Sequence, residues 1–420
     1  MGMTVAEKIL AAHSVDPVQE LRSGNFVNCR LDLVMGHDVS APRAIRLFRS
    51  MGAQRVFDRD KVVILEDHFV PASSINSAIH CQILKEFARE QDLTHYYPAG
   101  TGGICHALLP ELGLIRPGQL IAGGDSHTCT YGALGALSTG VGATDLAVAM
   151  ALGKMWFKVP ETLKVVFSGR PGPWSGAKDL ILHLLGLLGV EGARYQSVEL
   201  CGEPIENLSP DGRLTMANML VELGAKCGFL ANAKTGAGSA AVADADARYA
   251  QTITVDVTDL EPQAACPHSP ANVTPVSQAG KVAVDQVVLG SCTNGRLEDL
   301  RLAAGLLKGH KAAKGLRLIV VPATQKIYRE ALAEGLLEIF VESGAIVAPA
   351  TCGPCCGAHM GVLGPGETAV STTNRNFVSR MGHKESRVFL VGPAVAAATA
   401  VAGRLASPAE HWQEADGWRS

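Results

Sequence analysis

Three cysteines in the last third of the chain have the residue type and spacing of metal ligands. Cys352 and Cys355 form a Cys-x-x-Cys pair, a spacing that lets two thiolates reach one metal centre. Cys292 follows a predicted strand at residues 284–289, and Gly290 and Gly295 allow the tight backbone turns that would project its side chain. Three thiolates from two loops would hold a four-iron cluster and leave one iron open to a substrate.

Other uses of the Cys-x-x-Cys pair stay open on these residues alone. Cys352-Gly-Pro-Cys355 is also the sequence of a redox-active dithiol, although here it lies late in a long chain with no tryptophan before it. A zinc site made by the three cysteines and His359 is chemically possible. Cys356 is interpreted as a packing residue, because a side chain adjacent to Cys355 should point elsewhere.

Histidines close to carboxylates follow other predicted strands. Asp67 and His68 come after a strand at residues 62–65, and Asp125, Ser126 and His127 come after one at residues 120–122. A carboxylate beside an imidazole fixes its tautomer and raises its basicity, which suits proton transfer. His106 lies in a glycine-rich segment that we expect to be a turn. A lone histidine would be interpreted as structural, whereas three in similar places indicate acid–base chemistry.

Two arginines near the end of the chain suit the capture of carboxylates. Arg375 follows Asn374, and Arg380 lies five residues further on, next to an otherwise apolar strand end. The guanidinium group binds carboxylates in a two-pronged geometry, although an ordinary surface ion pair is the simpler interpretation. Asn218 and Glu222 are four residues apart, which places them on one face of a helix predicted at residues 216–224.

The elements that position these residues follow an α/β pattern. Short apolar runs predict strands, helical patterns separate them, and such alternation is typical of parallel sheets covered by helices. The expected strands are residues 62–65, 120–122, 163–167, 284–289, 316–321 and 388–391, and the expected helices are residues 41–51, 77–90, 145–152, 179–188, 297–307 and 325–334. Proline-rich stretches at 154–172 and 267–280 favour three α/β domains, at residues 1–160, 161–278 and 279–420.

Composition excludes several classes of protein. Of 420 residues, 47% are hydrophobic and 18% charged, and the net charge of -3 with no basic stripe argues against nucleic acid as a partner. The apolar runs at 180–190 and 391–403 are too short to span a membrane. The 11 cysteines are odd in number and scattered, unlike a secreted disulfide framework, and the N-terminus is polar. We therefore expect a cytoplasmic chain with no membrane partner.

Taken in order, the motifs resemble the aconitase superfamily. They are Asp67-His68, Gly103-Ile-Cys-His106, Asp125-Ser-His-Thr128, Gly290-Ser-Cys-Thr-Asn-Gly-Arg296, Cys352-Gly-Pro-Cys355 and Asn374-Arg-Asn-Phe377. Within the superfamily they look most like the large subunits of 3-isopropylmalate dehydratase and homoaconitase, from about Thr4 to about Leu405. The resemblance implies three α/β domains with parallel or mixed sheets around a central cleft, and one [4Fe–4S] cluster per chain.

The resemblance also implies roles for individual residues. Cys292, Cys352 and Cys355 match the cluster ligands, and His68, supported by Asp67, matches the proton donor to the departing hydroxyl. Asp125, Ser126 and His127 match groups near the substrate and the iron-bound water, and His106 with Glu222 matches a further histidine–carboxylate pair. Arg375 and Arg380 match the residues that hold substrate carboxylates, Asn294 and Asn374 line the same site, and His37 occupies a substrate-facing position.

The activity implied is that of a hydro-lyase that isomerises a 2-hydroxy acid by dehydration and rehydration. The first choice is conversion of 2-isopropylmalate to 3-isopropylmalate in leucine biosynthesis, with homoaconitase or a dehydratase of methyl-substituted malates as alternatives. The swivelling domain of aconitases is expected to be supplied by a separate small subunit. Two segments depart from the family pattern: Ser379 stands where glycine is usual, and residues 232–247 match poorly.

Overall fold

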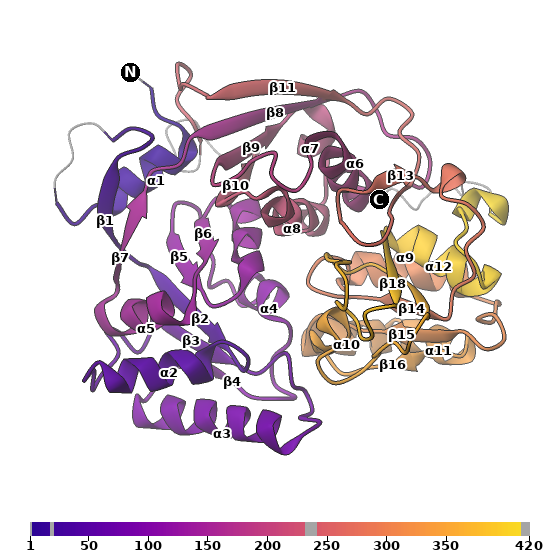
Figure 1. Ribbon diagram of the computed structural model, residues 1–420, viewed down its shortest axis with the longest axis horizontal. Coiled ribbons are helices and arrows are strands. Elements are labelled where there is room, and N and C mark those ends of the chain that lie inside the picture. The colour runs from indigo at the N-terminus through magenta and orange to yellow at the C-terminus, as the bar shows by residue number, and fades with distance from the viewer. Residues whose placement is uncertain (1, 17–20, 232–241, 413–420) are drawn as a thin grey trace.

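The computed structural model describes residues 2–16, 21–231 and 242–412. Its three main sheets are parallel or largely parallel (Figure 1). The predicted α/β class is confirmed. Most of residues 232–247, the poorly matching segment, lies outside the described residues. No described helix has both the length and the apolar character needed to cross a bilayer.

The first sheet has five parallel strands in the order β4-β3-β2-β5-β6. They are β2 (Leu33–His37), β3 (Val62–Leu65), β4 (His95–Tyr97), β5 (Leu120–Gly123) and β6 (Leu137–Gly140), with helices α1 (Val5–His13), α2 (Ala41–Ser50), α3 (Ile75–Glu90), α4 (Cys105–Glu111) and α5 (Ala143–Leu152) and the 3-10 helix η1 (Ser126–Leu134). Strand β3 is a fully buried run of Val, Val, Ile and Leu, as expected for a sheet covered on both faces. An antiparallel ribbon, β1 (Phe26–Arg30) with β7 (Lys154–Lys158), leads to the next layer.

The second sheet has four parallel strands in the order β10-β9-β8-β11. They are β8 (Thr162–Ser168), β9 (Ser197–Cys201), β10 (Cys227–Leu230) and β11 (Gln251–Asp256), with helices α6 (Ala177–Leu188), α7 (Glu203–Glu206) and α8 (Pro210–Asn218) and the 3-10 helix η2 (Met219–Leu223). The single α-helix predicted at 216–224 is therefore wrong. The α-helix ends at Asn218, a 3-10 turn follows, and Gly224 ends that turn with a φ of +82°.

The third sheet has seven strands in the order β13-β12-β18-β17-β14-β15-β16. They are β12 (Gln263–Ala265), β13 (Val273–Pro275), β14 (Gln286–Leu289), β15 (Arg317–Val320), β16 (Ile346–Val347), β17 (Thr368–Ser371) and β18 (Arg387–Val391), with helices α9 (Leu297–Leu307), α10 (Gln325–Ala333), α11 (Leu336–Glu342) and α12 (Pro393–Ala402) and the 3-10 helices η3 (Val276–Gln278), η4 (Gly353–Cys356) and η5 (Pro408–Glu410). Strand β12 pairs antiparallel with β18, so residues 263–275 belong to this sheet although they precede residue 279. The three domain ranges themselves stay a proposal.

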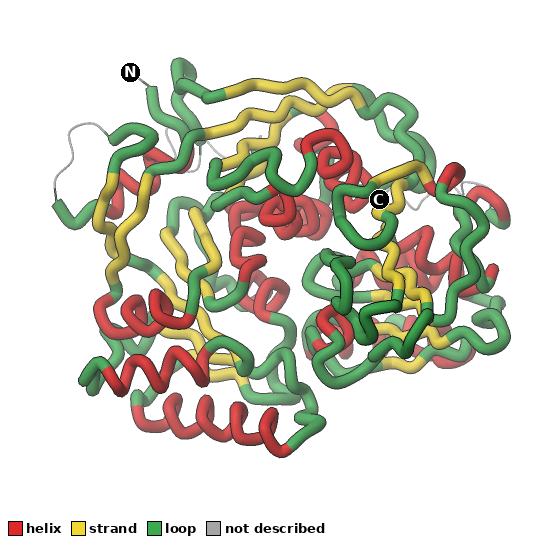
Figure 2. Tube along the Cα trace, in the orientation of Figure 1, coloured by secondary structure: helices red, strands yellow, loops and turns green. Residues whose placement is uncertain are grey.

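The carboxyl ends of the parallel strands hold the residues of interest. In the first sheet β2 lies between β3 and β5. Strand β2 ends at His37, β3 ends just before Asp67, and β5 ends just before Asp125. In the third sheet β14 lies beside β17, and their ends lead to Cys292 and Asn374. Loops gather on the side of the third sheet that faces the other two sheets (Figure 2).

Candidate active site

The loop after β14 carries Cys292 through a turn that only glycine allows. Gly290 has a φ of +110°, and a Cβ added there would lie 2.0 Å from the carbonyl oxygen of Val321. Cys352 and Cys355 lie in the loop after β16, where the backbone N–H of Cys352 donates to the carbonyl of Asp67 at 2.7 Å. This bond ties the cysteine loop of the third sheet to the histidine loop of the first.

Nitrogen donors surround the sulfur atoms. The Nδ2 atoms of Asn218 and Asn374 each lie 3.3 Å from the Sγ of Cys292. A guanidinium nitrogen of Arg380 lies 3.5 Å from the Sγ of Cys355. A hydrogen bond from Cys352 and the charge of Arg380 lower the pKa of Cys355 well below its usual value, against the effect of burial. Such donors favour the thiolate form, which is the form that binds metals.

Asp67 and His68 form the first histidine–carboxylate pair. The Nδ1 of His68 lies 2.6 Å from Oδ1 of Asp67, and Oδ2 of Asp67 accepts the backbone N–H of Cys105 at 2.9 Å. Burial alone would lower the pKa of His68, but the charge and hydrogen bond of Asp67 outweigh it and raise this pKa to about 10. The imidazole therefore holds a proton at neutral pH. Asp38 accepts the backbone N–H groups of His68 and Phe69 and so fixes this loop to the end of β2.

Asp125 forms the second pair and contacts two further histidines. Its Oδ1 lies 2.8 Å from the Nε2 of His106 and accepts the backbone N–H of His127 at 2.7 Å. Its Oδ2 lies 3.5 Å from the Nε2 of His37. The Nδ1 of His106 lies 3.3 Å from the hydroxyl of Tyr131. Burial lowers the pKa of His106 despite Asp125, which favours a neutral imidazole there.

His127, Glu222 and Arg375 form the third group. The Nε2 of His127 and the Nε of Arg375 lie 2.8 Å and 2.7 Å from the same oxygen of Glu222. Burial lowers the pKa of His127, but hydrogen bonds to Asp125 and Glu222 raise it above its usual value. Ser126, at the exposed edge, lies 3.3 Å from the Nδ1 of His127. Arg375 is thus oriented by a carboxylate of the second layer.

His37 presents an imidazole nitrogen to this region. The backbone N–H of Val39 donates to its Nδ1 at 3.2 Å, so the neutral ring carries its hydrogen on Nε2. That Nε2 is buried and has no hydrogen-bond partner. The ring stacks on His68 with centroids 4.2 Å apart. The Oδ2 of Asp125 lies 3.5 Å from this nitrogen without forming a hydrogen bond, so the donor is available to a bound ligand.

Three sequence-based expectations differ from the geometry. His106 lies in the first turn of helix α4 rather than in an irregular loop turn, and the backbone N–H of Cys105 at this helix start donates to Asp67. Glu222 pairs with His127 rather than with His106. Asn294 bonds to Lys178 at 3.3 Å and to Asp299 at 3.0 Å, so its side-chain contacts do not support a place at the histidines. The reason in each case is a partner from another part of the chain.

The structure also explains the unusual Ser379. This residue has a φ of +64°, a conformation that glycine adopts without strain, and it lies directly before Arg380. Cys356, interpreted as a packing residue, is partly buried, and His68 is among the charges that favour its thiolate. Asp38 is the main site residue that sequence reasoning did not select, and Asn218 was noted there only for its spacing from Glu222. For Asp38 the signal was its position after His37 at a strand end.

Comparisons with known proteins agree along most of the chain. A sequence model of the aconitase family (aconitate hydratase) matches residues 7–403. The 3-isopropylmalate dehydratase large subunit of Desulfatibacillum aliphaticivorans is 54% identical over 418 residues, which is 97% of this chain and 99% of the relative. That of Moorella thermoacetica is 55% identical over 420 residues, with 98% and 99% covered. 3-Isopropylmalate dehydratase large subunit 1 of Pyrococcus abyssi is 53% identical over 422 residues, again with 98% and 99% covered.

A solved structure shares the fold. The holo-form of Thermococcus kodakaraensis aconitase X superposes with a TM-score of 0.53, at 14% identity, over 83% of this chain and 84% of that chain. At that identity the likeness concerns the fold alone. The family match and the relatives, more than half identical along nearly the whole sequence, show that this chain belongs to the aconitase family.

Proposed function

We propose that the chain is the iron–sulfur subunit of a hydro-lyase that converts 2-isopropylmalate to 3-isopropylmalate, in leucine biosynthesis. The observation that carries the proposal is the convergence of three histidine–carboxylate pairs with three cysteines, two of which, Cys292 and Cys355, accept N–H donors at sulfur. The names of the relatives supply the substrate. Homocitrate and methyl-substituted malates are the alternatives to be assayed.

The cysteines fit a [4Fe–4S] cluster better than a zinc ion. Four ligands of one zinc ion at about 2.3 Å lie roughly 3.8 Å from each other. Among the described residues, the one group of metal-binding side chains whose ligand atoms all lie within 4.8 Å of one another is His37, Asp38, Asp67 and His68. Cys292, Cys352 and Cys355 are not part of that group, which speaks against a single zinc ion held by these thiols. The Nε2 of His359, the fourth ligand of a zinc site, bonds instead to the carbonyl of Val70 at 3.1 Å.

The same contacts speak against a redox dithiol. Catalysis of thiol exchange requires a sulfur accessible to another protein. Cys352 and Cys355 are both buried, and the N–H of Cys352 is held by Asp67 of another layer. Cys292, Cys352 and Cys355 would hold the cluster, with Asn218, Asn374 and Arg380 as donors to sulfur. When bound, the cluster supplies a Lewis-acidic iron with an open position for hydroxyl and carboxylate oxygens.

The protein side chains provide the remaining chemistry. His68 holds a proton because Asp67 raises its pKa, so it is suited to protonate the departing hydroxyl. Arg375 and Arg380 bind substrate carboxylates and stabilise the charge that develops on them when the proton of the adjacent C–H bond passes to a base on the proposed small subunit. The Nε2–H of His37 donates to a further substrate oxygen. His106 pairs with Asp125, and His127 pairs with Glu222. Both rings hold protons next to the proposed substrate-binding residues.

A small subunit is the proposed partner. The relatives are named large subunits, which implies a second chain for those proteins. In this chain Phe377 and Val378 are 41% and 56% exposed, directly between Arg375 and Arg380. Two large apolar side chains exposed between substrate-binding residues favour a protein surface that covers them. All 11 cysteines are free, which fits the reducing cytoplasm as the location we propose.

Anaerobic purification followed by iron and sulfide counting tests the cluster. The expected product is a brown protein with about four irons per chain. Cys355→Ser should lose the cluster, whereas the matched variant Cys356→Ser should retain it. A colourless protein that contains zinc would reject the proposal.

The substrate and the partner are tested together. The chain and the small subunit are assayed against 2-isopropylmalate, homocitrate and methyl-substituted malates, by the ultraviolet absorbance of the unsaturated acid. We expect 2-isopropylmalate to have the highest kcat/KM and the isolated chain to be inactive. Activity of the isolated chain with any of these acids would sink the two-subunit arrangement.

A further inference from the structure

Lys178 is a buried cation that the proposed reaction does not use. It lies in the first turn of α6, in the second layer, and is 1% exposed. Its Nζ donates to the Oδ1 of Asn294 at 3.3 Å and to the carbonyl oxygens of Thr372 and Thr373 at 2.8 Å and 2.6 Å. All three acceptors are uncharged. A buried ammonium is costly unless a negative charge compensates it.

The acceptors belong to the two loops that surround the cysteines. Asn294 lies two residues after Cys292, in the loop that follows β14. Thr372 and Thr373 directly precede Asn374, whose Nδ2 donates to the Sγ of Cys292. One ammonium group therefore joins the loop that holds a cysteine to the loop that holds a donor to the same sulfur.

The charges near Lys178 point to the same place. Burial lowers the pKa of Lys178 to about 8, and the charges that oppose this effect come first from Cys292 and Cys355 and then from Asp299 and Asp179. Asp179 is occupied with the backbone N–H groups of Gly176 and Gln263. Cys292 and Cys355 are thus among the groups whose negative charge would act on this ammonium once they hold a cluster.

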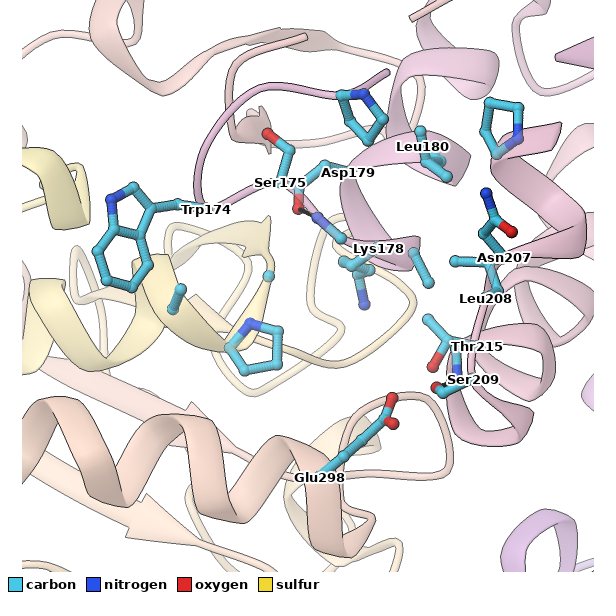
Figure 3. Close-up of a pocket in the computed structure, with 18 of the residues that line it drawn as sticks. Trp174, Ser175, Lys178, Asp179, Leu180, Asn207, Leu208, Ser209, Thr215 and Glu298 are labelled. Carbon is cyan, nitrogen blue, oxygen red and sulfur yellow. Dashed lines mark hydrogen bonds between the residues drawn. The ribbon is translucent and has the colours of Figure 1, made fainter. Parts of the chain in front are cut away.

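Lys178 also forms part of the wall of a cavity of about 980 Å³, between α6 and the starts of α8, α9 and α12. Figure 3 shows its side chain among the lining residues, with Ser175 and Asp179 on one side and Thr215 and Glu298 on the other. The cavity is not lined by the cysteines or the histidines. Lys178 therefore approaches the cysteine loops from the second layer, apart from the substrate-binding residues.

We propose that Lys178 is a positioning residue of the iron–sulfur site, which holds the Cys292 and Asn374 loops together and compensates the negative charge of the bound cluster. The inference rests on the proposed cluster. A [4Fe–4S] cluster bound by three thiolates is negatively charged, and its charge increases on reduction. A fixed positive charge nearby stabilises the reduced form more than the oxidised form, and so raises the reduction potential.

The test measures the midpoint potential of the reconstituted cluster by electron paramagnetic resonance during a redox titration. Lys178→Met removes the charge and keeps the length, and its potential should shift to a more negative value than in the wild type. Lys178→Arg keeps the charge and should lie closer to the wild type. Arg213→Met is the matched control, because Arg213 is also buried and also donates to backbone carbonyls, those of Ile205 and Leu230. Its potential should equal that of the wild type.

An unchanged potential in Lys178→Met with a full cluster, or an equal shift in Arg213→Met, overturns the inference. If Lys178→Met folds but binds no cluster, binding restored in Lys178→Arg supports the role of the charge, and no binding in either overturns it. If Lys178→Met does not fold, Lys178→Gln replaces it; failure of both to fold marks a purely structural residue and also overturns the inference. A wild-type chain without any cluster rejects the proposed function as well, whereas the other outcomes leave it standing.

Discussion

Replacing Asp67 with asparagine removes the charge that holds a proton on His68. The rise in the pKa of His68 from 6.5 to about 10 corresponds to roughly 5 kcal/mol in favour of the imidazolium. In Asp67→Asn, burial is opposed only by the charges of Asp38 and Cys356, so the pKa of His68 should fall well below its wild-type value. At neutral pH a larger fraction of the side chain would then be deprotonated and unable to donate a proton to the departing hydroxyl. We expect kcat to fall by about 10²–10⁴-fold.

The pH profile separates this effect from simple damage. A wild-type kcat/KM that needs protonated His68 declines only as the pH rises toward about 10, whereas the decline in Asp67→Asn should start at a lower pH. The raised pKa also stabilises the folded chain fully below 6.5 and progressively less as the pH rises toward 10. Urea unfolding should therefore separate wild type and variant more at about pH 6 than at about pH 9.5.

Asp32→Asn is the matched control for this experiment. Asp32 lies 2.7 Å from the Nε2 of His13, so it forms the same kind of pair in the same layer, away from the site. Its kcat/KM and pH profile should match those of the wild type. The reasoning is refuted if Asp67→Asn loses less than about tenfold in kcat and keeps the wild-type profile, or if Asp32→Asn changes activity as much.

Three further variants test other parts of the site. Asn218→Ala removes a donor to the Sγ of Cys292, so the variant should lose iron faster than the wild type on exposure to air. The rate is measured by the decay of the cluster absorbance, and an unchanged rate would contradict a role for this bond. Ser379→Gly relieves the strain of a φ of +64°. It should raise the free energy of urea unfolding by about 0.5 kcal/mol, which is the strain released minus the larger conformational entropy of glycine in the unfolded chain. Ser379→Val should lower the free energy of unfolding. The double variant Phe377→Ser/Val378→Ser should bind the small subunit at least about tenfold more weakly and still retain the cluster. Calorimetry measures the Kd, and an unchanged Kd would place the interface elsewhere.

The fold could be predicted where the local sequence alone determines the secondary structure. The strand at 62–65 and the helix at 297–307 have the predicted bounds, because a short run of β-branched residues and a periodic apolar face carry their own signals. The predicted helix at 216–224 was wrong at its end. The change to a 3-10 turn at Met219 has no strong local signal, since Asn218 is fixed by contacts with Thr130 and Cys292, which are distant in sequence.

The candidate site was predictable as a set of residues but not as a set of contacts. Motif spacing selected His106, His127 and Glu222, yet it could not decide which histidine pairs with Glu222. The partners are separated by 95 residues and come from different layers, so only the packing of the second sheet against the first determines the pair. Asn294 and Asn218 have the same side chain. Contacts with Lys178 and Asp299 turn the former away from the histidines.

Asp125 gives the site a property that no single pair would have. One carboxylate lies close to the ring nitrogens of His106 and His37 and accepts the backbone N–H of His127. A proton gained or lost on His127 changes the field at His106, so these two histidines and Asp125 titrate with shared, macroscopic steps. Substitutions of His106 and His127 should therefore be non-additive. Under the proposed function, protons shared in this way would allow a dehydration and the reverse hydration to use the same protons in turn.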